Sequence, residues 1–114
     1  MTFTPGAELD PEAVEERVES AIDEHDVVLF MKGSPMMPQC GYSRKALALL
    51  QRHREDIETV DVLENLEAYR AALEPYSGRE TIPQTFVNGE FVGGSDILEQ
   101  LEERGELAET LSIA

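Results

Sequence analysis

The sequence predicts an α/β fold, a four-stranded mixed sheet flanked by helices on both faces. Strand-like runs alternate with helical patterns in the order αβαβαββα. Residues 27–31 are continuously apolar, which is typical of a strand covered on both faces in a mostly parallel sheet. Further on, Asn88-Gly89 stands between two extended segments, the usual signal of a two-residue type I′ hairpin. A parallel βαβ unit joined to an antiparallel hairpin accounts for all three observations.

In the first half of the chain the pattern predicts a helix on each side of the apolar strand. Asp10 is a good N-cap and Pro11 suits the first helical position. A second helix is expected over about 41–53, after a loop at 32–39, because this stretch is rich in Ala and Leu. Cys40 therefore lies at the amino end of a helix. The first helix continues through an apolar stripe at i, i+4 and i+8, formed by Val14, Val18 and Ile22.

The second half begins with a strand and a third helix. Residues 57–62 roughly alternate apolar and polar side chains and predict the strand. Pro75 and Gly78 are expected to end the helix that follows. The strands of the hairpin are expected at 85–87 and 90–92. The third helix is recognised by apolar residues at helical spacing, namely Leu66, Tyr69, Ala72 and Leu73.

The chain closes with more helix. Ser95 and Asp96 are good capping residues, so a fourth helix is expected to run from them to about Arg104, with a short terminal helix after it. This order of elements is that of the thioredoxin-like fold. A length of 114 residues is the size of one ordinary domain, so residues 1–114 are expected to form a single domain of this fold.

Charge limits the classes of partner. Nine Lys and Arg stand against 24 Asp and Glu, which gives a net charge of −15. Such a charge repels phosphate backbones and anionic lipids, so neither nucleic acid nor a membrane is expected as a partner. Purely apolar runs reach only four or five residues, and no secretory signal pattern opens the chain. We therefore expect a cytoplasmic protein.

The composition also suggests a salt-rich environment. The only two lysines are Lys32 and Lys45, and an acid-rich, lysine-poor chain is typical of halophilic proteins, whose self-repulsion is screened by counterions. The alternative is an acidic protein from ordinary salt conditions, kept in solution by its charge.

Cys40 is the one cysteine of the chain, so neither an internal disulfide nor a zinc site of the CxxC kind is possible. Unpaired amides at a helix start stabilise negative charge, lower a thiol pKa and enrich the thiolate. The alternative is an inert, buried thiol. Because turn-like and polar residues flank Cys40, the reactive interpretation is favoured, and a second molecule must then complete its chemistry.

Four motifs, in order along the chain, resemble those of the monothiol glutaredoxins. They are Met-Lys-Gly-Ser-Pro at 31–35, Pro-Gln-Cys-Gly-Tyr-Ser at 38–43, Thr-Ile-Pro-Gln at 81–84 and Val-Asn-Gly-Glu-Phe-Val-Gly-Gly-Ser-Asp-Ile-Leu at 87–98. Together they span nearly all of the chain after the first helix. The resemblance implies a thioredoxin-like fold and a thiol site at Cys40 that binds glutathione.

The resemblance also assigns cationic residues to the glutathione carboxylate. Lys32, at the end of the first strand, matches a lysine that the family uses to bind glutathione. Arg70, in the third helix, matches a second carboxylate-binding position, and a guanidinium suits bidentate binding. One extra residue separates Asp61 from Arg70 relative to the common pattern, so an ordinary surface arginine is the alternative.

The remaining glutathione-binding residues are implied in the same way. Ile82 and Pro83 resemble the cis-proline turn, where the backbone of the residue before proline pairs with the glutathione peptide. Ser95 and Asp96, at a helix start, would hold the α-carboxylate and ammonium of the γ-glutamyl group. Tyr42 stands beside the thiol where the family usually has phenylalanine.

One departure from the family pattern lies in the loop before Thr81. Arg79-Glu80 stands where Trp-Pro is common. This change affects the packing of the loop beside the bound thiol, and with it the choice of thiol.

Ser43 stands where a dithiol oxidoreductase has its second cysteine, so that catalytic route is closed. The resemblance implies instead a 2Fe-2S cluster shared by two protomers and two glutathiones, which supplies the four thiolates that such a cluster typically needs. The protein would be a monomer without the cluster and a homodimer with it, exchanging clusters with scaffold proteins and apo iron-sulfur proteins. In a salt-adapted lineage γ-glutamylcysteine would replace glutathione.

Two alternatives remain at this point. One is an enzyme, a glutathione-dependent monothiol oxidoreductase in which the Cys40 thiolate attacks a mixed disulfide and an external thiol resolves it. The other is a redox-inactive interaction module of the same fold.

Overall fold

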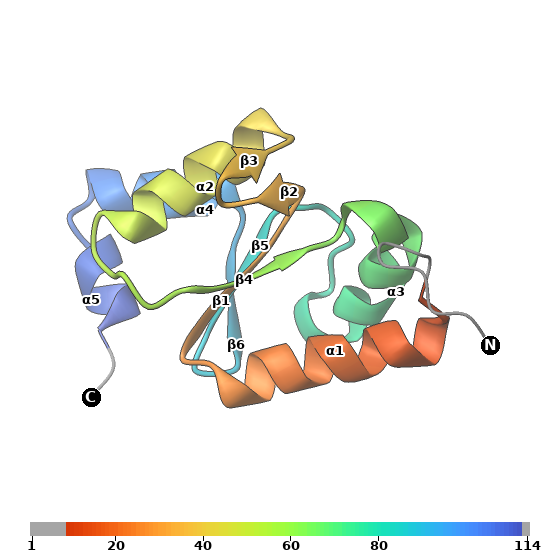
Figure 1. Cartoon of the computed structure of the whole chain (residues 1–114). Coiled ribbons are helices and arrows are strands. Elements are labelled where there is room, and N and C mark those ends of the chain that lie inside the picture. Colours follow the sequence, from red (N-terminus) through yellow and green to blue (C-terminus); the bar gives the residue numbers. More distant parts are fainter. Residues whose placement is uncertain (1–8, 113–114) are drawn as a thin grey trace.

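The computed structural model describes residues 9–112, and its centre is one mixed sheet of four strands in the order β4-β1-β5-β6 (Figure 1). Strand β1 runs parallel to β4 and antiparallel to β5, and β5 pairs antiparallel with β6. The predicted α/β architecture is therefore confirmed. The strands are β1 (Val27–Met31), β4 (Glu58–Asp61), β5 (Gln84–Val87) and β6 (Glu90–Gly93).

Strand β1 lies at the centre of the core, and all five of its residues are buried. Because side chains alternate across a strand, they divide between two apolar clusters. Val28 and Phe30 pack in the cluster on one face of the sheet. Val27, Leu29 and Met31 pack in the cluster on the other. A continuous apolar run is thus explained by a sheet covered on both sides.

Helices cover the two faces of the sheet (Figure 1). One face is covered by α1 and α3, which contact each other, and the other by α2, α4 and α5. A short 3-10 helix, η1 (Leu63–Asn65), precedes α3. The helices are α1 (Pro11–Glu24), α2 (Gly41–Gln51), α3 (Leu66–Ser77), α4 (Ser95–Glu103) and α5 (Leu107–Leu111). None of the helices described has both the length and the apolar character needed to cross a bilayer.

In the two helices of the α1/α3 face, the sequence predicted one helix end correctly and the other incorrectly. Asp10 caps α1 as predicted, because its Oδ1 accepts a hydrogen bond from the Ala13 N–H at 2.9 Å. Pro75, in contrast, does not end α3, which continues to Ser77 and stops at Gly78 with φ 73°. A proline near the end of a helix removes one backbone hydrogen bond, and packing of the same helix on α1 maintains the last turn.

The loop predicted at 32–39 contains a small hairpin formed by β2 (Gly33–Ser34) and β3 (Met37–Pro38). Gly33 adopts φ 92°, and a Cβ there would lie 2.5 Å from the Met37 carbonyl oxygen. The hairpin is therefore tight enough to require glycine at this position. It leads directly into Cys40 at the start of α2.

The β5–β6 connection is the turn that the sequence predicts. Asn88 and Gly89 have φ values of 51° and 81°, both positive, as a type I′ turn requires. The turn fixes the register of β6, so that its end leads into α4. The predicted domain bounds of 1–114 include residues 1–8 and 113–114, which lie outside the described residues.

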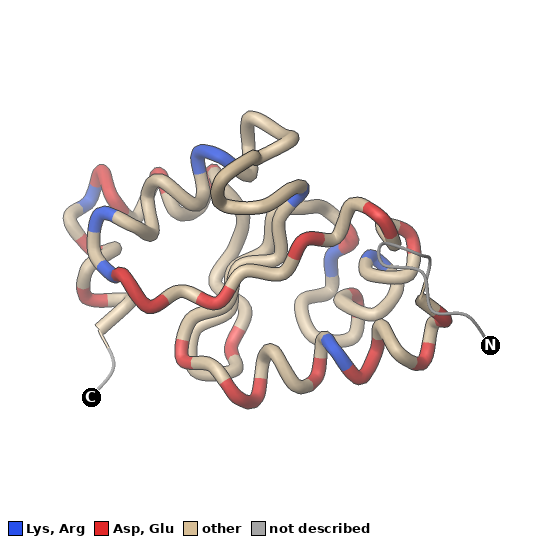
Figure 2. The backbone as a smooth tube through the Cα atoms, viewed as in Figure 1, with Lys and Arg blue, Asp and Glu red and all other residues tan. Residues whose placement is uncertain are grey.

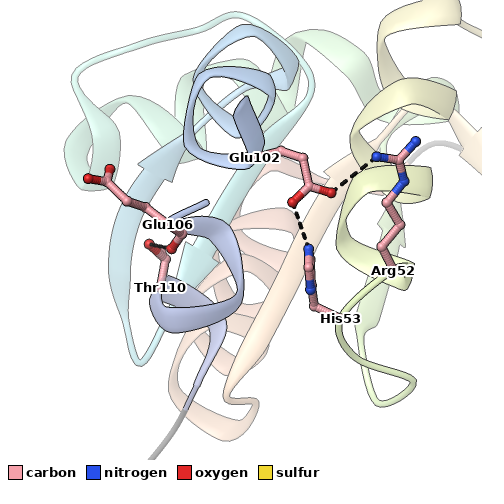
Figure 3. Close-up of polar contacts among 5 residues, drawn as sticks. All are labelled: Arg52, His53, Glu102, Glu106 and Thr110. Carbon is pink, nitrogen blue, oxygen red and sulfur yellow. Dashed lines mark hydrogen bonds and ion pairs between the residues drawn. The ribbon is translucent and has the colours of Figure 1, made fainter. Parts of the chain in front are cut away.

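A polar cluster joins the end of α2 to α4 (Figure 3). Glu102 accepts a hydrogen bond from the Arg52 guanidinium at 3.1 Å and lies 2.9 Å from the His53 ring nitrogen. These two contacts hold the pKa of the Glu102 carboxyl below its ordinary value. Glu102 thus fastens the end of α2, the helix capped by Cys40, to α4. Beyond α4, the Thr110 hydroxyl donates to the Glu106 carbonyl at 2.9 Å and closes the first turn of α5.

Candidate functional site: a thiol and an adjoining groove

Cys40 occupies the N-cap position of α2 and is partly exposed. Its backbone is extended, and its side chain makes no capping hydrogen bond. The first amides of the helix therefore remain available to a negative charge at the sulfur. This is the placement that the sequence predicts for a reactive thiol.

The surroundings of Cys40 favour its thiolate. Partial burial raises the pKa of the thiol, but this is outweighed by the backbone amides of Ser43 and Tyr42, the charge of Lys32 and the Ser43 hydroxyl. The net result is a Cys40 pKa below its ordinary value. Because only the thiolate is a strong nucleophile and metal ligand, this shift prepares the residue for either role.

Lys32 is held close to the thiol by two backbone hydrogen bonds. Its N–H donates to the hydroxyl of Ser43 at 3.0 Å, and its carbonyl accepts from the Gln39 N–H at 2.9 Å. Ser43 is completely buried, so the first of these bonds is shielded from water. The end of β1, the hairpin and the start of α2 thus form one unit around Cys40.

The segment that carries the thiol differs in charge from the rest of the chain. Residues 27–54 contain no Asp or Glu, although the whole chain has 24. In Figure 2 the tube through β2, β3 and the start of α2 correspondingly carries no acidic colour. The exposed residues near Cys40 are instead apolar or cationic: Met36 is 94%, Met37 67% and Tyr42 63% exposed, and Arg44 and Lys45 are exposed too. An anionic ligand or cluster therefore meets little repulsion from its own segment.

A groove of about 670 Å³ lies beside this thiol region. One wall is the loop at 79–83, which contains the cis peptide bond between Ile82 and Pro83. The other wall is the end of β6 and the start of α4, at 92–97. Tyr42 joins the groove to the thiol, because this residue lines the groove and its backbone amide acts on Cys40.

Two glycines allow the walls to approach each other. Gly93 adopts φ 152°, and a Cβ there would lie 2.6 Å from the Ile97 side chain. A Cβ on Gly94 would lie 3.1 Å from the Pro83 carbonyl oxygen. The turn from β6 into α4 therefore passes close to the loop that contains the cis-proline.

The start of α4 differs in detail from the prediction. Gly94, and not Ser95 or Asp96, is the N-cap, and it has no side chain to bind the first amides. Ser95 is buried and Asp96 is exposed in the first turn, where both line the groove. Unpaired amides and a carboxylate thus stand side by side, an arrangement suited to the carboxylate and ammonium of an α-amino acid.

The predicted site residues therefore form two groups, one at the groove and one at the thiol, and Arg70 belongs to neither. Five of them line the groove, and Lys32 lies with Cys40 at the thiol. Arg70 lines neither, and its guanidinium donates to the Glu67 carboxylate at 2.6 Å. The five groove residues are Tyr42, Ile82, Pro83, Ser95 and Asp96.

The sequence did not assign Arg79, which lines the groove, or Gln84, which supports the groove wall from below. Arg79 is one of the residues that line the groove, and it is exposed. Gln84 is fully buried below the loop, and its Nε2 donates to the carbonyls of Arg79 at 2.9 Å and Thr81 at 3.0 Å. The one signal in the sequence was that Arg79-Glu80 departs from the family pattern, but a departure alone does not show where the side chain lies.

A cysteine at a helix N-cap, next to a groove walled by a cis-proline loop, on a four-stranded mixed sheet, defines a thiol protein of the thioredoxin-like fold. Residues 27–92 match the family model described as Glutaredoxin. This chain belongs to the glutaredoxin family, as its motifs indicate.

Relatives and solved structures agree with this placement. The ycf64-like monothiol glutaredoxin of Synechocystis sp. is 45% identical over 98 residues, 86% of this chain and 91% of that protein. Glutaredoxin 4 of Escherichia coli is 41% identical over 96 residues, 84% of this chain and 83% of that protein. The solution structure of reduced poplar apo GrxS14 superposes with a TM-score of 0.73 at 39% identity, over 86% of this chain and 89% of that one. The resemblance to monothiol glutaredoxins is thus confirmed.

Proposed function

We propose that this protein carries a 2Fe-2S cluster, held between two copies of the chain by Cys40 of each copy and by two small γ-glutamyl thiols. The observation that carries the proposal is the pairing of a partly exposed Cys40 of lowered pKa with a buried serine at position 43. The first supplies a thiolate ligand. The second removes the cysteine that would make the chain a dithiol reductase.

The ligand count supports thiols from outside the chain. Within residues 9–112 no three His, Cys, Asp or Glu side chains come together in a way that would hold a metal ion. A 2Fe-2S cluster typically needs four thiolates, of which two chains supply two. Two bound thiol molecules supply the others. Because half of the ligands exchange freely, the cluster is a cargo that scaffold proteins donate and apo-proteins accept.

The groove supports a γ-glutamyl thiol as the external ligand. In this proposal the amides at the start of α4 bind the α-carboxylate of the γ-glutamyl group, and Asp96 binds its ammonium. The backbone of Ile82 pairs with the peptide part of the thiol, and Tyr42 covers it beside the sulfur. Lys32 is proposed to share in binding its second carboxylate from outside the groove, whereas Arg70 would first have to leave Glu67. A cytoplasmic location and adaptation to high salt stay predictions from composition.

A second candidate function is favoured by the same low thiol pKa. As a monothiol oxidoreductase, the Cys40 thiolate attacks the glutathione sulfur of a mixed disulfide and releases the substrate thiolate. A glutathione thiolate then attacks the new disulfide, which frees Cys40 and leaves glutathione disulfide. This route needs no cluster and no second protomer.

Anaerobic reconstitution separates the two candidates. The apo-protein is incubated with ferrous iron, sulfide and either glutathione or γ-glutamylcysteine, and iron and acid-labile sulfide are then counted per chain. The cluster carrier should give a coloured species with about one 2Fe-2S unit per two chains, and Cys40→Ser should abolish it. Rapid turnover of a small mixed disulfide by the wild type, with no cluster formed, would favour the oxidoreductase.

A further inference from the structure

One cationic residue and one anionic residue line the groove. They are Arg79 on the 79–83 loop and Asp96 at the start of α4. No ion pair or side-chain hydrogen bond engages the Arg79 guanidinium within residues 9–112. In a chain with 24 carboxylates, an arginine without an acidic partner is available for an external anion.

The backbone of Arg79 is fixed although its side chain is free. Its N–H donates to the Ser77 hydroxyl at 3.0 Å, and its carbonyl accepts from Gln84 Nε2 at 2.9 Å and from Ser77 Oγ at 3.0 Å. Because Gln84 is fully buried, the loop is tied to the core of the sheet. The side chain of Arg79 therefore extends from a fixed backbone, which reduces the ordering that binding requires.

A γ-glutamyl thiol presents two carboxylates to the protein. The unpaired amides of α4 and the Asp96 carboxylate already form a complete set of partners for the α-amino acid end. A guanidinium at that end would repel the ammonium group. The second carboxylate, at the far end of the thiol, is therefore the group that Arg79 can bind.

The cationic residues outside the groove are less available for that role. Arg70 is half-buried and already bonded to Glu67 at 2.6 Å. Lys32 lies at the thiol, where its charge acts on Cys40. Arg79 thus differs from both in lining the groove, and from Arg70 also in having no acidic partner.

We propose that Arg79 is a specificity-determining residue of the thiol site, whose guanidinium binds the C-terminal carboxylate of the γ-glutamyl thiol. The proposal rests on the proposed function in taking such a thiol as the ligand. It assigns ligand selection to the loop where the sequence departs from the family pattern. Gln84 acts there as a positioning residue, through its bonds to the loop carbonyls.

Binding is measured by nuclear magnetic resonance titration of the apo-protein with two probes that cannot form a disulfide. The first is S-methylglutathione, and the second is its glycine ethyl ester, in which the C-terminal carboxylate is masked. The wild type should bind the first probe several-fold more tightly than the second, about three- to tenfold for an exposed ion pair with hydrogen bonds. Arg79→Gln should lose most of this difference, with any remainder due to Lys32, and Arg79→Lys should recover part of it.

Arg104→Gln is the matched control, because this exposed arginine follows α4 and does not line the groove. It should discriminate between the probes as the wild type does. If Arg79→Gln keeps the full discrimination, or if Arg70→Gln removes it instead, the inference about Arg79 is overturned while the thiol site stands. If the wild type binds neither probe, the proposed function fails, and the inference fails with it.

Discussion

The buried hydroxyl of Ser43 accepts a hydrogen bond from the backbone N–H of Lys32 at 3.0 Å. This contact joins the first turn of α2, which carries Cys40 at its N-cap, to the residue that follows β1. Ser43 is therefore more than an unreactive replacement for a second cysteine. It satisfies a backbone donor and keeps the Lys32 charge close to the thiol.

Removing this acceptor should destabilise the fold. Ser43→Ala leaves the Lys32 N–H without its partner in a partly buried site, so the free energy of unfolding should fall by about 1–3 kcal/mol. Urea denaturation of the apo-protein measures the change. Ser20→Ala, at an exposed position of α1, is the control and should alter stability by less than about 0.5 kcal/mol. Equal stabilities of the two variants would show that the contact contributes nothing.

The charge of Lys32 should be visible in the reactivity of Cys40. A positive charge near a thiol favours the thiolate and lowers the pKa, so Lys32→Gln should raise the Cys40 pKa and move alkylation to higher pH. The measurement is the pH dependence of the alkylation rate at low ionic strength, where the charge is least screened. The wild-type midpoint should lie below the ordinary value for a thiol, because its pKa is lowered.

The other lysine of the chain provides the control for this experiment. Lys45 forms its ion pair with Glu99 on α4, and its charge is not among those that act on Cys40. Lys45→Gln should leave the alkylation midpoint where it is in the wild type. Identical midpoints for Lys32→Gln and the wild type would remove Lys32 from the thiol site.

Gln84 should control the order of the groove wall. Replacing it by Met keeps the volume but removes the donors to the carbonyls of Arg79 and Thr81. The amides at 79–82 should then exchange with solvent faster, while those of β1 should keep their protection. Hydrogen exchange followed residue by residue makes the comparison. If exchange at 79–82 is unchanged, other contacts hold the loop.

The strands of the sheet could be predicted well because their signals lie in short stretches of neighbouring residues. A continuous apolar run such as β1 and an Asn-Gly turn need only neighbouring residues to be recognised. The end of α3 was harder to predict from the sequence, because packing on α1 carries the helix past Pro75. The cap of α4 fell on Gly94, where the close approach of Pro83 from a distant segment favours glycine.

The site, too, has a part that neighbouring residues predict and a part that only the fold reveals. The thiol and its helix position follow from residues close together in the sequence. The groove joins Tyr42 to segments far along the chain, so only the fold reveals that Arg79 lines it and Arg70 does not. Figure 1 shows how this arises, since α2 and α4 lie on the same side of the sheet although β4, α3 and the hairpin strands separate them in the chain.

The charge of the chain predicts that salt stabilises it. The net charge is −15, and in Figure 2 acidic positions are spread over α1, the segment before β4 and the later helices. Their mutual repulsion is screened as the Debye length falls from about 10 Å at 0.1 M salt to about 3 Å at 1 M. The melting temperature of the apo-protein should therefore rise steeply over this range of potassium chloride. A flat response would refute adaptation to high salt and leave the cluster proposal untouched.

Native mass spectrometry of the anaerobically reconstituted protein tests the central claim most directly, because it weighs every component of the complex at once. The account predicts one species made of two chains, one 2Fe-2S cluster and two γ-glutamyl thiols, and predicts only apo monomer for Cys40→Ser. A cluster bound to a single chain, a dimeric cluster complex without the small thiols, or the same complex formed by Cys40→Ser would contradict it.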